Sequence, residues 1–252
     1  MATETRRRPW LKEPLLLGLL AFSVFDFPRL AALLSPLIGE GKPSVEWAPL
    51  PVLAGQHIGV VLLSSTASFL VAFSLGAASH LYGLKGLQEL LLNVGSFGES
   101  FPTAAVIALA VPALGYGFEP LLLALFLYGL LPVLMNTIQG LTGLDRDVVQ
   151  AAEGMGLTRV QRLLRVELPL AAPMILAGVR TAVIINIAAA SIGSVVGAGG
   201  LGMPIVSGIR TFDPVLILKG TIPIALLALL ADSLFRRAER RLDRRVRSAT
   251  PA

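Results

Sequence analysis

The chain contains no cysteine, and it is poor in aromatic and charged residues. Of its 252 residues, 6% are aromatic and 15% are charged. Without thiols, neither disulfide bonds nor thiolate metal sites are available. So few charges beside 54% hydrophobic residues, with a mean hydropathy of +0.75, exclude an ordinary soluble domain. The composition therefore predicts an all-α, polytopic membrane protein.

Motifs for catalysis are also missing. No Walker A sequence occurs, so the chain cannot hydrolyse ATP through a P-loop of its own. No Ser/His/Asp or metal-ligand set is visible, and His57 and His80 flank one apolar run, where we expect them to be interfacial. Gly197 to Gly202 match the dinucleotide-binding pattern, but they follow an apolar helix and not a strand. We therefore expect a backbone turn at these glycines, and no catalytic residue, cofactor or metal in this chain.

About six apolar runs are long enough to cross a bilayer, if a short third one is included. A bend is expected in the first run, where Pro28 separates Asp26 from Arg29, and these two residues should form an ion pair. Pro102 and Pro112 interrupt the third run and predict a broken helix. Residues 39–55 are expected to form an external loop, and residues 81–98 a cytoplasmic turn with a half-buried helix. The expected spans are about 14–38, 57–79, 100–115, 120–141, 170–196 and 214–235.

The basic residues predict the orientation of the chain in the membrane. If the N-terminus is cytoplasmic, sixteen of the 21 Lys and Arg residues fall on the cytoplasmic side and only Lys42 and Arg210 in outer loops. Positive residues are retained on that side of membranes. Both termini are therefore expected in the cytoplasm. The net charge of +5 is explained by this pattern, and no nucleic-acid partner is expected.

Residues 145–169 form the only long polar segment between apolar runs. Val148, Ala151, Ala152 and Met155 recur at the spacing of one helix face. Gly154 and Gly156 are suited to a helix end, and Thr158 with Gln161 predicts a capping box that starts a second helix. Arg159, Arg162 and Arg165 would line that helix, facing lipid headgroups or a partner. The segment is thus expected to be an amphipathic helix pair that docks into a partner's groove.

Ala151-Ala152, Gly156 and Val166-x-Leu168-Pro169 resemble the EAA loop of ABC-importer permeases, with Gln150 where that family usually has Glu. The resemblance implies a type I permease core, an extra N-terminal helix and a loop that docks onto a separate ATPase subunit, which binds the ATP. It also implies a second permease subunit, identical or not, and an extracytoplasmic binding protein, in a bacterial inner membrane. The residues implied in coupling to the ATPase are Val148, Ala151, Ala152, Glu153, Gly154, Met155, Gly156 and Arg159.

Residues 96–102, 127–133 and 176–187 resemble the osmoprotectant branch of these permeases, closest to the low-affinity glycine betaine permeases. The implied activity is import of glycine betaine or a related quaternary amine. Alternatives are import of another small solute such as methionine, an ion-coupled secondary transporter, or a membrane-bound enzyme. Ion coupling usually needs intramembrane carboxylates, and only Asp26 lies clearly inside an expected span. The scattered aromatic residues favour a conduit and leave selection of the solute to the binding protein.

The expected organisation has three parts. These are an N-terminal tail, helix and loop (1–55), the permease domain (56–235, with its coupling loop at 142–169), and a basic cytoplasmic tail (236–252). Uncharged polar residues within apolar runs should face the bundle interior, where they line the pathway or bond across helices. The pathway candidates are Pro102, Asn136, Asn186 and Ser191.

Overall fold

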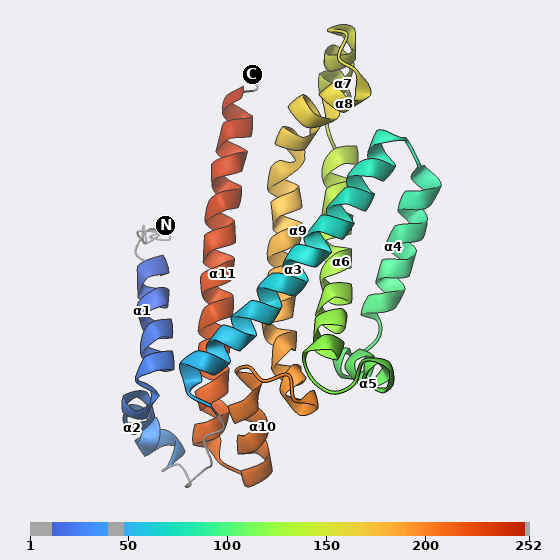
Figure 1. Ribbon diagram of the computed structural model, residues 1–252. Helices are drawn as coiled ribbons and strands as arrows, with labels where there is room; N and C mark the ends of the chain where they lie inside the picture. The colour runs from blue at the N-terminus through green and yellow to red at the C-terminus, as the bar shows by residue number, and fades with distance from the viewer. Residues whose placement is uncertain (1–11, 40–47, 250–252) are drawn as a thin grey trace, which may run out of the picture.

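The computed structural model describes residues 12–39 and 48–249, which form a bundle of helices (Figure 1). Within these ranges no β-strand occurs, and this confirms the predicted all-α class. Four segments in the described ranges are long and apolar enough to cross a membrane, or up to six if each of two bent helix pairs is one span. The elements are α1 Lys12–Phe25, α2 Phe27–Ile38, α3 Leu50–Leu81, α4 Lys85–Glu99, α5 Thr103–Leu114, α6 Phe118–Thr142, α7 Arg146–Gly154, α8 Arg159–Arg162, η2 Leu163–Glu167, α9 Leu168–Ala189, η3 Ala190–Val196, α10 Gly202–Thr211 and α11 Pro214–Ala249.

Helices α3, α6 and α9 pack at the centre, and small residues let them approach closely. A Cβ added to Gly129 of α6 would lie 2.6 Å from the Ser68 hydroxyl of α3. The same atom on Gly178 of α9 would lie 2.6 Å from the Pro132 carbonyl of α6. Ser68 also donates to the Phe126 carbonyl across the helix boundary, at 2.7 Å. In a membrane, burial of apolar side chains contributes little to helix association, so helices associate through close packing of small and hydroxylated residues.

The first apolar run, expected as a span at 14–38 with a bend, forms two helices that meet at a bend, as predicted. α1 and α2 meet at an angle of 92° beside Asp26. Pro28 lies in the first turn of α2, a position that needs no backbone N–H. Arg29 Nη1 lies 2.9 Å from the Asp26 carboxylate, so the predicted ion pair beside a bend is confirmed.

The third expected span is broken at Pro102, as predicted, but its bounds of 100–115 are wrong. Instead α4 runs from its turn after α3 back along the bundle, and α5 leaves it at 92° (Figure 1). Pro102 has an extended backbone and is the N-cap residue of α5, so α4 does not continue into α5 as one straight helix. The apolar side chains of Leu90, Val94 and Phe97 are 58–68% exposed on α4. The polar residues at the start of α4 explain the expectation of a cytoplasmic turn with a half-buried helix over residues 81–98.

Two other boundaries differ from expectation. α3 begins at Leu50, so the last residues of the expected 39–55 loop are helical; positions 40–47 lie outside the described residues. The helix that contains the fifth span begins at Arg159, passes through the π-helical η2 and continues to Val196. Pro169 lies in the first turn of α9, a position that suits proline, but no gap precedes it. The π turn accommodates a proline that has no N–H to donate to the preceding turn.

The glycine-rich segment after η3 is a backbone turn, as expected. Gly197, Gly199 and Gly200 have φ of 80°, 76° and 80°, values that residues with a Cβ rarely adopt. The turn returns the chain to α10, which packs against α11.

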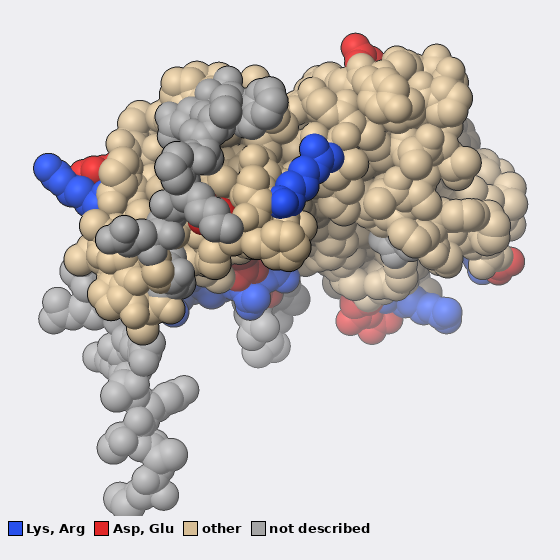
Figure 2. Space-filling model, turned by 90° about the horizontal axis from the view of Figure 1, so that it is seen from below, with Lys and Arg blue, Asp and Glu red and all other residues tan. Residues whose placement is uncertain are grey.

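The molecule has two distinct ends. The loop of α7 and α8, the α3–α4 turn and the end of α11 lie at one end, and α2, α5 and α10 at the other (Figure 1). The second end presents mostly uncharged side chains (Figure 2). The segments expected in the cytoplasm are therefore gathered at one end of the bundle.

Candidate functional site

The loop between α6 and α9 forms two helices, as predicted, and both have N-terminal caps, of which only the second was expected. Asp145 accepts a hydrogen bond from the Asp147 N–H, at 2.9 Å, and begins α7. α7 ends at Gly154, and Gly156 has a φ of 78°. Thr158 and Gln161 form the predicted capping box, with bonds of 3.0 and 3.3 Å, and begin α8. These caps hold the two helices in a defined turn, since each is worth about 1 kcal/mol.

The helix face predicted for docking is partly buried within this chain and partly exposed. Ala152 is 1% exposed and packs inside this chain, and Val148 is half-buried. Ala151 is exposed and Met155 is 73% exposed at the end of α7. On the following helix Val160 and Leu164 are 52% and 58% exposed. A partner can therefore reach an apolar surface formed by Met155, Val160 and Leu164, which we call the loop patch.

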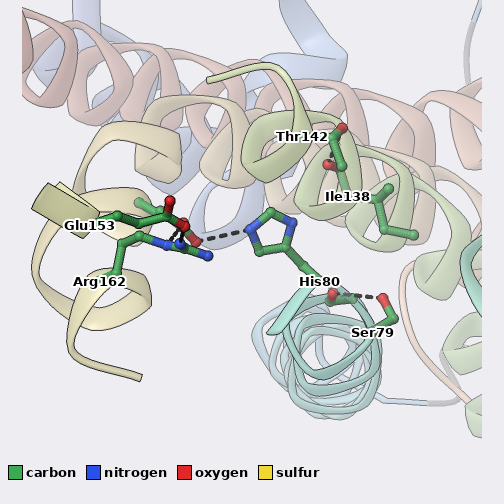
Figure 3. Close-up of polar contacts among 8 residues, drawn as sticks. Ser79, His80, Ile138, Thr142, Glu153 and Arg162 are labelled. Atoms are coloured by element: carbon green, nitrogen blue, oxygen red, sulfur yellow. Dashed lines mark hydrogen bonds and ion pairs between the residues drawn. The ribbon is translucent and has the colours of Figure 1, made fainter. Parts of the chain in front are cut away.

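A buried carboxylate ties the loop to the bundle. Glu167 is 2% exposed, and its Oε2 lies 2.9 Å from His80 Nε2 at the end of α3. Its Oε1 accepts from Arg162 Nε at 2.6 Å, and Arg162 also pairs with Glu153 of α7. Figure 3 shows His80, Arg162 and Glu153 pointing toward one another. We call these four residues the loop cluster. It connects α3, α7 and the start of the long helix through hydrogen bonds and ion pairs.

Sequence analysis missed most of this cluster. His80 was expected to be interfacial, Arg162 to face headgroups or a partner, and Glu167 was given no role. The available signal was weak: a single acid, five residues after an arginine and just before an apolar span. A carboxylate at the start of a span is energetically costly unless it is paired, so its position indicates a buried partner.

A cavity of about 450 Å³ adjoins the loop cluster. Its walls come from the α3–α4 turn, the end of α6 and the start of α7. The contact between α7 and the bundle is therefore incomplete, and side chains of the loop cluster line the cavity between them. The lining residues include His80, Lys85, Thr142, Arg146, Gln150, Arg162 and Glu167.

The remaining residues expected in coupling lie on the outside of the loop. Gly154, Gly156 and Arg159 are exposed. The Glu153 side chain is 56% exposed while it pairs with Arg162. These residues are accessible to a partner together with Met155.

The four pathway candidates are not brought together around a cavity. Asn186 is fully buried and donates to the hydroxyls of Ser65 and Ser64, at 3.0 and 3.3 Å, so it bonds across α9 and α3. Asn136 donates to the Pro132 carbonyl of its own helix, and Ser191 to the Ala188 carbonyl. Pro102 is exposed at the α4–α5 bend.

His57 is not interfacial, contrary to expectation. It is 1% exposed, and its Nε2 lies 2.9 Å from the Ile187 carbonyl of α9. It also lies under the glycine-rich turn, where a Cβ on Gly200 would be 3.4 Å from its Nδ1. Within residues 12–39 and 48–249, no group of three or more His, Cys, Asp or Glu residues is placed to hold a metal ion.

An apolar cavity of about 470 Å³ lies between α3, α9 and α11. Phe69 and Phe73 of α3 stack at its wall, with ring centroids 5.3 Å apart. Every lining side chain is apolar, so a carboxylate placed there would have no side-chain donor. The lining residues are Phe69, Phe73, Leu168, Ala172, Ile175, Leu176, Val179 and Leu242.

Comparisons with known proteins agree with this architecture. The chain is 36% identical over 187 residues to the choline transport system permease protein OpuBB of Bacillus subtilis, covering 74% of this chain and 85% of that protein. It is 38% identical over 191 residues to the osmoprotectant import permease protein OsmY of Salmonella typhimurium, covering 76% and 81%. Among solved structures, the inward-facing MetNI methionine ABC transporter matches with a TM-score of 0.66 at 17% identity, covering 74% of this chain and 93% of that one.

The model of one protein family matches residues 59–248, which include α6, the loop and α9 but not α1 and α2. That match spans most of the chain, and the sequence relatives cover most of their own lengths. The chain belongs to the family described as the inner membrane component of binding-protein-dependent transport systems.

Proposed function

We propose that this chain is the permease subunit of an ATP-driven importer for glycine betaine or a related quaternary amine such as choline or carnitine. The sequence relatives support this solute class, since their names describe choline, carnitine and osmoprotectant transport. The likeness to the methionine transporter supports the fold alone, because the identity is 17%. Import of methionine remains the alternative within the same class.

One observation carries the proposal: the capped loop presents the loop patch outward while the loop cluster ties it to α3. A partner ATPase that moves this loop would therefore pull on α3 through Glu167. ATP is bound by that partner, and this chain forms the path across the membrane. The implied assembly contains two ATPase subunits, a second permease subunit and an extracytoplasmic binding protein. A relative from Helicobacter pylori, the ergothioneine transport permease/binding protein EgtU, joins a permease and a binding protein in its name; this chain covers 26% of it.

The orientation follows from the charges. Both termini and the loop lie on the cytoplasmic side of a bacterial inner membrane. A protease added outside right-side-out vesicles should then leave a C-terminal tag intact. Cleavage of the tag from outside would contradict this orientation.

Ion coupling has little support among the described residues. Three of the acids near or within the spans pair with bases: Asp26 with Arg29, Glu167 with Arg162, and Asp232 with Arg180. A proton- or sodium-coupled carrier needs a carboxylate that can change partner during transport.

The test is reconstitution of the permease with its ATPase and binding protein in proteoliposomes. Labelled glycine betaine should accumulate only with ATP and binding protein, and excess methionine should not compete. Uptake driven by an ion gradient without ATP would refute the importer assignment. Competition by methionine would refute the solute class alone.

A further inference from the structure

A pocket of about 450 Å³ lies between α1 and α11. We call it the α1–α11 pocket. Two helices far apart in the sequence build it, and α1 lies outside the residues that match the family. Its lining residues are Lys12, Leu16, Leu229, Asp232, Ser233, Arg236 and Arg240.

The two helices are fastened together beside this pocket. Glu13 is 8% exposed, accepts from the Ser233 hydroxyl at 3.2 Å, and lies 3.5 Å from Arg237 Nη1. These contacts hold the start of α1 against residues 233–237 of α11. The pocket is therefore a built feature of the helix pair.

The pocket has an excess of positive charge. Lys12, Arg236 and Arg240 face a single acid, Asp232. Asp232 already accepts from Arg236 Nε at 2.8 Å and from Arg180 Nη1 at 3.3 Å. Among the described residues, Lys12 and Arg240 take part in no ion pair. Two cations are thus available to an anion that enters.

The polarity of the pocket changes along the helices. Leu229, then Asp232 and Ser233, then Arg236 and Arg240 follow one another on α11, over about 16 Å. On α1, Leu16 lies one turn further into the bundle than Lys12. The apolar wall therefore lies on the side of the membrane interior and the cations on the side of the surface, where lipid headgroups lie.

We propose that the α1–α11 pocket binds an anionic phospholipid, with its phosphate at Lys12 and Arg240 and the start of an acyl chain along Leu16 and Leu229. A zwitterionic lipid supplies no net negative charge for the two cations. A free phosphate supplies the charge but leaves the apolar wall uncovered. The lipid would join the added N-terminal helix to the last helix of the family core.

Native mass spectrometry of the purified full chain in detergent tests this, with phosphatidylglycerol as the probe. The variant carries Lys12→Ala and Arg240→Ala. The matched control carries Arg241→Ala and Arg244→Ala, which remove two exposed cations from the same helix without touching the lining. Each lining cation removed should weaken phosphatidylglycerol binding about fivefold, or about 25-fold for the pair. The control should bind within twofold of the unmodified chain.

Two further arms separate the sources of the anion. Phosphatidylcholine should bind at least tenfold more weakly than phosphatidylglycerol, and millimolar inorganic phosphate should not displace the bound lipid. Equal binding of both lipids, or equal losses in the variant and the control, would overturn the proposal. Displacement by phosphate would also overturn it, because the pocket would then be a free-anion site. The melting temperatures of all variants should equal that of the unmodified chain, which shows that a loss of lipid binding does not come from a loss of folding.

Discussion

Glu167 is the residue on which the attachment of the loop depends most. It is almost fully buried and contacts His80 and Arg162 at 2.9 and 2.6 Å. A buried charge pair is weak evidence for stability, but removal of one member leaves the other buried without a partner. Removal of one member of the loop cluster therefore costs more stability than replacement of the whole cluster by well-packed apolar side chains.

Glu167→Ala should destabilise the chain by about 3 kcal/mol, because Arg162 loses its buried acceptor. Glu167→Gln keeps the shape and an acceptor oxygen, so it should cost less. Melting temperatures in detergent measure both. The control is Glu89→Ala, an exposed acid on α4, which should change stability by less than about 0.5 kcal/mol. Equal effects at positions 167 and 89 would show that the loop cluster does not hold the loop.

Asn186 is the second residue with a specific structural role. Asn186→Ala removes its hydrogen bonds to Ser64 and Ser65, and such bonds between membrane helices average about 0.6 kcal/mol and reach about 1.7. Because Asn186 is buried away from the cavities, the variant should lower the transport rate without changing the preference among betaine, choline and carnitine. Competition uptake assays check this against Asn93→Ala, an exposed asparagine on α4. An altered preference would place Asn186 on the solute path.

At the scale of elements, the turn between α7 and α8 offers a matched pair of glycines. Both Gly154 and Gly156 have open space where a Cβ would lie, but only Gly156 has a positive φ, of 78°. Gly156→Asp should therefore strain the turn by about 1–2 kcal/mol and uncouple ATP hydrolysis from uptake. Gly154→Ala, within α7, should be tolerated or slightly stabilising.

The measurement is the ratio of solute moved to ATP hydrolysed in proteoliposomes. It should fall for Gly156→Asp and stay unchanged for Gly154→Ala. A normal ratio in an assembled Gly156→Asp complex would contradict the assignment of this turn to coupling.

Sequence reasoning predicted elements well where local signals were strong. The span at 120–141, the capping box that begins α8 and the turn at Gly197–Gly200 needed only hydropathy, capping residues and glycine. The prolines also predicted a break in the runs at 14–38 and 100–115. The 92° angles at these breaks could not be predicted, because each depends on what the next helix packs against.

The site divides in the same way. The loop and its exposed Met155 follow from local periodicity. The contact between His80 and Glu167 joins positions 87 residues apart, and no local pattern contains it. The burial of His57 against Ile187 is hidden for the same reason.

At the scale of the whole molecule, we propose that the chain acts as a conduit. The apolar cavity between α3, α9 and α11 offers two stacked Phe rings but no side-chain donor for a carboxylate. Titration calorimetry on the purified permease without its binding protein should therefore show no betaine affinity tighter than about millimolar, roughly 4 kcal/mol. A micromolar site would place solute selection in this chain.

The central claim is that the loop patch docks onto an ATPase, and the absence of cysteine allows a direct test. Met155→Cys introduces a single thiol at a position that is 73% exposed. Val94→Cys, at a 61% exposed position of α4, is the control for accessibility. In membranes that contain the assembled importer, a short thiol-directed crosslinker should join Cys at position 155 to the ATPase subunit and leave the control unlinked. If position 94 crosslinks to the ATPase and position 155 does not, the loop is not the docking element.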